Sequence, residues 1–196
     1  IIDCLYESLQ IRKCENMSKI VVLTGSPRKK GNSNSLADSF CNEARLAGHK
    51  ITRFDTTRLK IGGCRACDAC FVNDTPCAFE PKYNMISDAI EESDVIVLIF
   101  PVYWYAVPAQ LKSVIDHWYA FCMAEKTFKG KKAIIISCCG EYDMSVFDSI
   151  RSSMNKSFEL LECDEVEELY LTGIEDIGDI NNTDGITKVK ELAHKF

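Results

Sequence analysis

The chain has 196 residues, a formal net charge of −6 and 11 cysteines. This length suits one domain whose core needs no disulfide or metal, and an acidic balance without a basic patch argues against nucleic-acid binding. No apolar stretch approaches the roughly 20 residues that cross a bilayer, so we expect neither a membrane span nor a membrane partner.

The first 16 residues differ from the rest of the chain. They show no strand periodicity, whereas Met17 leads directly into an apolar run at 20–23. We therefore interpret residues 1–16 as a non-native or disordered extension. Residues 17–196 are expected to form a single domain.

Five short segments are predicted as strands. Three are continuous runs rich in Val and Ile, which is typical of strands buried on both faces of a parallel sheet. Two weaker segments complete the set, and acidic residues flank the last one, as suits an edge strand. The five segments are residues 20–23, 49–54, 95–100, 133–137 and 167–172.

Helical patterns fall between the predicted strands. In the third one, apolar residues from Leu111 to Cys122 recur at helical spacing on one stripe, and Pro108 suits the first turn. Alternation of strand and helix indicates right-handed parallel crossovers, so the fold class is α/β with helices on both faces of a doubly wound sheet. The predicted helices are residues 33–47, 84–92, 108–122, 144–161 and 183–194.

The loop after the first predicted strand is a candidate phosphate site. In a five-stranded sheet of order 2-1-3-4-5, ligands bind outside the carboxyl ends of strands one and three. Residues 25–35 open a helix there and offer backbone N–H groups, serine hydroxyls and the guanidinium of Arg28. The loop has neither a Walker nor a G-x-G-x-x-G pattern, which disfavours nucleoside triphosphates and a Rossmann-type NAD site. A polar turn with a helix cap is the alternative.

The loop after the predicted strand 95–100 carries three successive aromatic residues, Tyr103, Trp104 and Tyr105. Adjacent side chains cannot all face the core. At least one is therefore expected in the crevice, where a flat aromatic ligand could stack. A contact between subunits is the alternative, and both can hold if a partner subunit closes the site.

A third loop starts at Ser137 and contains Gly140, which lets the backbone approach a ligand ring. The vicinal pair Cys138 and Cys139 lies in the same loop. We interpret these two cysteines as packing residues rather than as a redox pair.

Four cysteines fall within fourteen residues in a C-x2-C-x2-C-x6-C pattern. The first two spacings suit thiolate ligation of an iron–sulfur cluster. Zinc is the competing metal, although three cysteines at i, i+3 and i+6 would crowd its tetrahedral coordination. A third possibility is that the thiols are free, in a loop packed by Phe71 and Phe79. The candidate ligands are Cys64, Cys67, Cys70 and Cys77.

Long strand and helix patterns disfavour a secreted disulfide scaffold, so we expect a cytoplasmic protein.

Three segments together resemble the NAD(P)H-dependent FMN reductase and iron–sulfur flavoprotein family: residues 25–33, 64–77 and 101–116. The resemblance extends from Ser18 to about Phe196 and implies a flavodoxin-like fold that binds FMN. One departure is His117, where relatives often carry Arg, and we assign this histidine no catalytic role.

The resemblance also implies which residues contact the cofactors, and it names no side-chain acid or base. The four cysteines match the motif that ligates a 4Fe–4S cluster in iron–sulfur flavoproteins. The FMN phosphate is expected at Ser26, Arg28, Asn32, Ser33 and Asn34. The isoalloxazine ring is expected against Pro101, Val102, Tyr103, Trp104, Ser137, Cys138 and Gly140.

The function implied is an FMN-dependent oxidoreductase. It would move electrons from NAD(P)H or ferredoxin to a small acceptor such as a quinone, nitro or azo compound, with or without a 4Fe–4S cluster. The alternatives are a non-enzymatic FMN and iron–sulfur electron-transfer protein, and a module that binds another phosphate-bearing ligand in the same cleft. A homodimer or homotetramer is expected.

Overall fold

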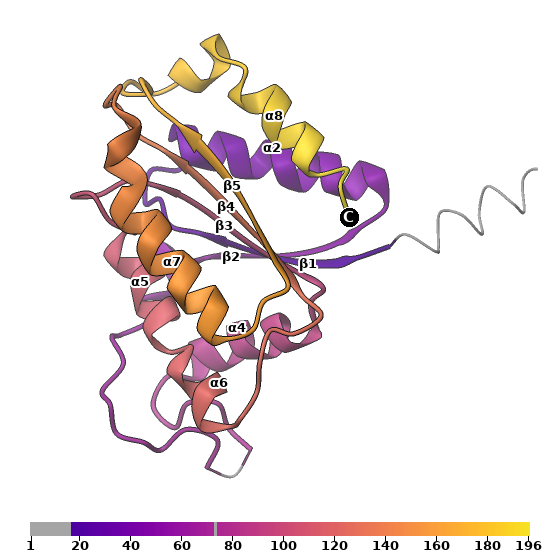
Figure 1. Cartoon of the computed structure of the whole chain (residues 1–196), viewed down its shortest axis with the longest axis vertical. Helices are drawn as coiled ribbons and strands as arrows, with labels where there is room; N and C mark the ends of the chain where they lie inside the picture. The colour runs from indigo at the N-terminus through magenta and orange to yellow at the C-terminus, as the bar shows by residue number, and fades with distance from the viewer. Residues whose placement is uncertain (1–16, 73) are drawn as a thin grey trace, which may run out of the picture.

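The computed structural model describes residues 17–72 and 74–196, so the extension predicted for residues 1–16 lies outside the described residues. Five parallel strands form one sheet in the order β2-β1-β3-β4-β5 (Figure 1). This arrangement confirms the predicted doubly wound sheet. The strands are β1 (Lys19–Thr24), β2 (Lys50–Asp55), β3 (Val95–Pro101), β4 (Lys132–Cys138) and β5 (Glu165–Leu171).

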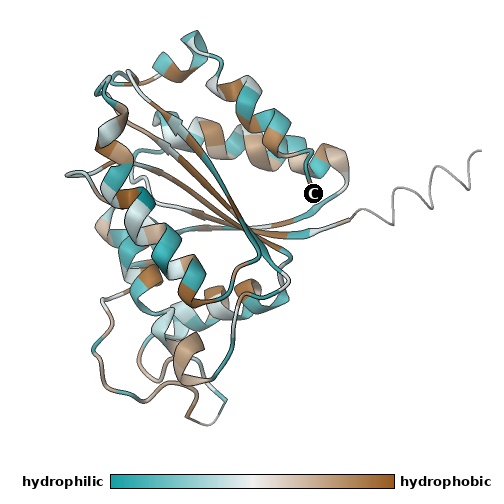
Figure 2. Cartoon of the chain, in the orientation of Figure 1, coloured by the Kyte–Doolittle hydropathy of each residue, from teal (hydrophilic) through white to brown (hydrophobic). Residues whose placement is uncertain are grey.

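The sheet is apolar on both faces, and Figure 2 shows its central strands as the most hydrophobic part of the chain. Successive side chains of a strand point to opposite faces. Val21 and Leu23 therefore pack into one core, while Ile20 and Val22 pack into the other. The edge strands β2 and β5 are mostly half-buried, which confirms the edge position expected for the last strand.

Helices cover both faces of the sheet (Figure 1). The pair α2 (Asn32–Ala47) and α8 (Gly185–Leu192) covers one face. The other face carries α4 (Pro81–Glu92), α5 (Ala109–Asp116) and α7 (Asp148–Leu160). Four shorter elements complete the fold: α3 (Thr56–Leu59), α6 (Tyr119–Met123), and the 3-10 helices η1 (Met144–Phe147) and η2 (Asp179–Asn182).

The single helix predicted for residues 108–122 is wrong, because the chain forms α5 and α6 with a break at His117. The Nδ1 atom of His117 lies 2.7 Å from the carbonyl oxygen of Ser113, the acceptor that a continuing α-helix would give to the His117 N–H. That N–H instead donates to Val114 at 3.1 Å. Cys122 is exposed, so the expected apolar stripe ends before it.

The fourth predicted helix, residues 144–161, begins as the 3-10 helix η1 before α7. The Asp143 carboxylate accepts a hydrogen bond of 2.9 Å from the Ser145 N–H and caps this first turn. Within the described residues, no helix combines the length and the apolar character that a membrane span requires.

Candidate functional site

A cavity of about 570 Å³ lies at the carboxyl ends of β1, β3 and β4, where the strand order reverses. All three loops singled out from the sequence line it. Among the predicted cofactor contacts, only Asn34 and Ser137 do not line this cavity. Those that do are Ser26, Arg28, Asn32, Ser33, Pro101, Val102, Tyr103, Trp104, Cys138 and Gly140.

The first loop presents the N-terminus of α2 to the cavity. The N-cap of α2 is Gly31, which has no side chain to cap the helix, and the first turn has no acidic residue. The first N–H groups of a helix have no partner within the helix, and the helix dipole adds partial positive charge there. Ser26 and Ser33 line the cavity beside this end although both are buried. This combination is typical of an anion site.

The loop closes tightly at Gly31. Its N–H donates to the carbonyl oxygen of Arg28 at 2.9 Å, and a Cβ atom added to Gly31 would lie 3.1 Å from that oxygen. The same Cβ atom would lie 3.4 Å from the Ser26 hydroxyl, so a larger residue would crowd both the turn and this hydroxyl.

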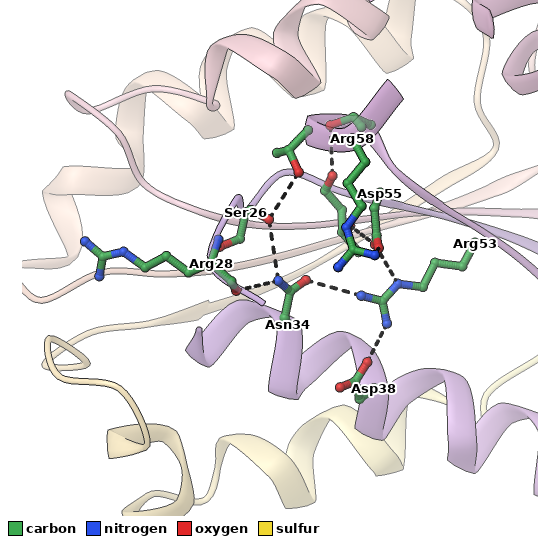
Figure 3. A network of polar contacts seen from close by, with 10 residues as sticks. Ser26, Arg28, Asn34, Asp38, Arg53, Asp55 and Arg58 are labelled. Atoms are coloured by element: carbon green, nitrogen blue, oxygen red, sulfur yellow. Dashed lines mark hydrogen bonds and ion pairs between the residues drawn. The ribbon is translucent and has the colours of Figure 1, made fainter. Parts of the chain in front are cut away.

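Asn34 lies behind the loop rather than in the cavity (Figure 3). Its Nδ2 atom donates to the carbonyl oxygen of Arg28 at 2.7 Å and lies 3.5 Å from that of Ser26. The Arg28 side chain points away from this network in Figure 3 and lines the cavity. Asn34 thus holds loop carbonyls, and its direct contact with phosphate stays a prediction.

Asn32 connects the first loop to the segment after β5. Its Nδ2 atom donates to the Asp176 carbonyl oxygen at 2.8 Å, and its Oδ1 atom accepts from the Gly178 N–H at 2.9 Å. This segment adds Ile174, Glu175 and Ile177 to the cavity wall. The sequence analysis missed these residues, since only contacts between distant parts of the chain bring them here.

The second loop is a tight turn that displays aromatic side chains. Tyr103 and Ala106 exchange two backbone hydrogen bonds of 3.0 Å, and the Ser149 hydroxyl donates to the Tyr105 carbonyl oxygen. Trp104 and Tyr105 have φ angles of 48° and 59°, in the left-handed region that aromatic residues rarely adopt. All three aromatic residues line the cavity, and Trp104 is 94% exposed.

The third loop forms the remaining wall. Burial, with a smaller contribution from Cys139, raises the pKa of Cys138 to about 12, so its thiol is neutral at pH 7. Ser137 is fully buried behind this wall, and its hydroxyl has no partner among the described residues. The sequence analysis also missed Tyr142, an 85% exposed ring at the cavity whose edge packs on Gly173.

The four clustered cysteines line a second, small cavity of about 20 Å³ beside α6. Tyr119 donates a hydrogen bond of 3.0 Å to the Asp68 carboxylate and holds the cysteine loop there. Burial raises the pKa of Cys70, and the neighbouring Cys64 and Cys77 add to this shift. In residues 17–72 and 74–196, no three Cys, His, Asp or Glu side chains are arranged to hold a single metal ion.

His117 belongs to this second cavity and not to the first. It is buried, and its ring packs on Tyr83 with 4.7 Å between the ring centroids. This agrees with a packing residue. The two cavities share no lining residue and lie at opposite ends of α5.

Comparison with known proteins gives one family. The family described as NADPH-dependent FMN reductase matches residues 18–149. An iron-sulfur flavoprotein of Archaeoglobus fulgidus is 32% identical over 113 residues, which cover 58% of this chain and 50% of that protein. An iron-sulfur flavoprotein of Methanosarcina thermophila is 25% identical over 169 residues, which cover 86% of this chain and 82% of that protein. The chain thus aligns with only half the length of the first of these relatives.

Among solved structures, an NAD(P)H:quinone oxidoreductase from Methanothermobacter marburgensis is similar with a TM-score of 0.74 and 18% sequence identity. The match covers 91% of this chain and 96% of that one. At this level of identity the likeness establishes a common flavodoxin-like fold.

Proposed function

The chain belongs to the NADPH-dependent FMN reductase family, and from this premise we propose that it is an FMN-dependent oxidoreductase. It takes electrons from NAD(P)H or ferredoxin and passes them to a small acceptor such as a quinone, nitro or azo compound. One observation carries the proposal: an uncapped helix N-terminus and a turn of three aromatic residues face the same 570 Å³ cavity.

The first loop would hold the phosphate of FMN. The N–H groups of Asn32 and Ser33 begin α2, and the buried hydroxyls of Ser26 and Ser33 stand beside them. Arg28 supplies a guanidinium that can form a bidentate pair with a phosphate. Every one of these groups can donate a hydrogen bond, which suits an anion.

The second and third loops would hold the flat ring between Pro101–Tyr105 and Cys138–Tyr142. When bound, FMN accepts a hydride from a reduced nicotinamide and releases electrons singly or in pairs. The chain's part is to orient the ring and exclude water. The neutral thiol of Cys138 adds no negative charge beside a ring that becomes more negative on reduction.

We also propose that the four-cysteine loop binds a 4Fe–4S cluster. Such a cluster would take four thiolate ligands, which would surround a pocket instead of converging on one ion. Cys64, Cys67, Cys70 and Cys77 all line the second cavity, and this shared lining supports the proposal. Cys64 and Cys67 are exposed, and this favours, as a second candidate function, an electron carrier that docks a redox protein there.

We further propose a cytoplasmic homodimer or homotetramer. The nine cysteines of the described residues form no disulfide with one another, which suits a reducing compartment. The exposed ring of Trp104 offers a contact for a second subunit at the edge of the cavity.

Binding of FMN and riboflavin to the apoprotein tests the phosphate assignment, since riboflavin lacks the phosphate. Arg28→Ala combined with Ser33→Ala should weaken FMN binding by about 2–4 kcal/mol and leave riboflavin binding unchanged. Arg45→Ala, in the last turn of α2, is the control. Unchanged FMN affinity in the double variant would refute the assignment.

Turnover separates the two candidate functions. Steady-state oxidation of NADPH or NADH with a quinone supports the enzyme. Protein-bound flavin that is reduced by ferredoxin but by neither nicotinamide supports the electron carrier.

A further inference from the structure

A polar network lies behind the first loop, and most of its side chains do not line the cavity (Figure 3). It is built from the end of β2 and the residues that follow. The Thr56 hydroxyl donates to the Thr24 carbonyl oxygen at 2.9 Å, and the Thr57 hydroxyl lies 3.5 Å from the Ser26 carbonyl oxygen. The edge strand therefore supports the loop that starts at the end of β1.

Arg53 is the centre of this network. Its Nη2 atom donates to the Asn34 Oδ1 atom at 3.2 Å, its Nη1 atom to Asp38 at 2.5 Å, and its Nε atom to Asp55 at 3.1 Å. One guanidinium thus joins β2 to two positions of α2. It has three acceptors spread around one plane, a pattern that a lysine ammonium on a flexible stem does not reproduce.

The contact with Arg53 determines which way the Asn34 amide faces. A guanidinium only donates hydrogen bonds, so the amide must turn its oxygen toward Arg53. Its nitrogen then faces the loop and donates to the Arg28 carbonyl oxygen at 2.7 Å. The opposite orientation would place a carbonyl oxygen against the Arg28 carbonyl and two donors against Arg53.

We infer that Arg53 is a positioning residue for phosphate binding: through Asn34 it holds the carbonyls of the first loop away from the cavity, so that N–H groups and hydroxyls face the phosphate. The inference rests on the proposed FMN site. Carbonyl oxygens turned into the cavity would repel a phosphate, and Arg53 prevents this without touching the ligand.

Arg53 acts here through geometry and not through its charge. The side chains of Asp38 and Asp55 both form ion pairs with the guanidinium, at 2.5 and 3.1 Å, and two carboxylates balance its positive charge. Arg53 does not line the cavity. A variant that keeps the positive charge but loses the planar donor set should therefore lose the effect.

The test measures the affinities of the apoprotein for FMN and riboflavin in Arg53→Lys. We expect FMN to bind about tenfold more weakly, the loss of roughly one good hydrogen bond, while riboflavin affinity changes less than about twofold. The matched control is Arg151→Lys, because Arg151 also pairs with two carboxylates, Glu168 and Asp148, on the other side of the sheet. Its FMN and riboflavin affinities should stay at the wild-type values.

A double-mutant cycle with Asn34→Ala checks the route. If Arg53 acts through the Asn34 amide, Arg53→Lys should change FMN affinity less than about twofold once that amide is gone. A full tenfold loss in the Asn34→Ala background would overturn the inference. So would an equal loss of FMN and riboflavin affinity in Arg53→Lys, which would indicate general loosening of the fold.

The wild-type protein separates this inference from the proposed function. If wild type binds riboflavin as tightly as FMN, the phosphate site itself is refuted, and the role of Arg53 with it. If wild type prefers FMN and Arg53→Lys keeps the full preference, only the role of Arg53 is refuted.

Discussion

The Thr24 hydroxyl donates a hydrogen bond of 2.7 Å to the Asp55 carboxylate, and this bond joins the carboxyl ends of β1 and β2. Arg53 and Arg58 form ion pairs with the same carboxylate at 3.1 and 3.6 Å. Burial alone would raise the pKa of Asp55, but the hydrogen bond from Thr24 and the neighbouring positive charges outweigh it and lower that pKa.

We predict that Asp55→Asn lowers the free energy of unfolding by about 1–2 kcal/mol at pH 7. A carboxylate whose pKa is lowered on folding stabilises the fold above its unfolded pKa of about 4, and this contribution disappears as the pH falls through the folded pKa. Urea unfolding at pH 7 and at pH 2 to 3 should therefore show the difference from wild type shrinking in acid. Asp88→Asn, an exposed position of α4, is the control. A difference that persists undiminished in acid would contradict the prediction.

The cysteine cavity should be separable from the flavin cavity by spectroscopy. Cys67→Ala is expected to remove bound iron and the broad visible absorbance of a cluster, while the flavin peaks remain, because the two cavities share no lining residue. Cys122→Ala is the control, since this exposed cysteine lies outside the cysteine cavity. Iron analysis and a visible spectrum after anaerobic purification measure this. A wild-type protein that contains no iron would refute the proposed cluster.

Substitution of Trp104 should weaken binding of the acceptor without changing the stability of the fold. Because its side chain is 94% exposed, Trp104→Ala should change the free energy of unfolding by less than about 0.5 kcal/mol. Loss of an aromatic stacking surface of about 1 kcal/mol should raise the KM for a flat quinone roughly fivefold. Leu160→Ala, another exposed apolar residue, should leave the KM unchanged. A quinone KM that does not respond to Trp104→Ala would exclude stacking on this ring.

A substitution of Ser137 tests whether this serine contacts the cofactor or is only buried behind the cavity wall. Its hydroxyl is buried without a partner among the described residues, so Ser137→Ala should leave the free energy of unfolding unchanged or raise it by up to about 1 kcal/mol. FMN affinity should not change, because Ser137 does not line the cavity. Weaker FMN binding in a fully stable variant would show that the hydroxyl reaches the cofactor after all.

The sheet and the place of the cavity could be predicted from the sequence because they depend on local patterns. Continuous apolar runs identified β1, β3 and β4, and the rule for parallel sheets placed the loops. The break at His117 could not be predicted, since it depends on one ring nitrogen binding a carbonyl one turn earlier. The spacing of apolar residues does not indicate such a hydrogen bond.

The hydrogen bonds of Asn34 could not be predicted for a related reason. Its residue type and position suit a phosphate contact, but the direction of its amide depends on Arg53, which lies in β2. The position of the Ser137 side chain was also hard to predict. Side chains of a strand alternate between the two faces of the sheet, and the sequence does not show which residue at the carboxyl end of the strand reaches a ligand. The segment from Ile174 to Ile177 reaches the cavity through contacts with Asn32, more than 140 positions earlier.

The support for the first loop comes from β2, which is an edge strand with a neighbour on one side only. Edge strands fray more readily than central ones, and each fraying event of β2 would release the Arg53 anchor and with it the loop. By linkage, a ligand that needs the anchored loop must in turn suppress fraying. Amide hydrogens of β2 should therefore exchange more slowly in the presence of FMN, although none of the residues from Lys50 to Asp55 lines its cavity.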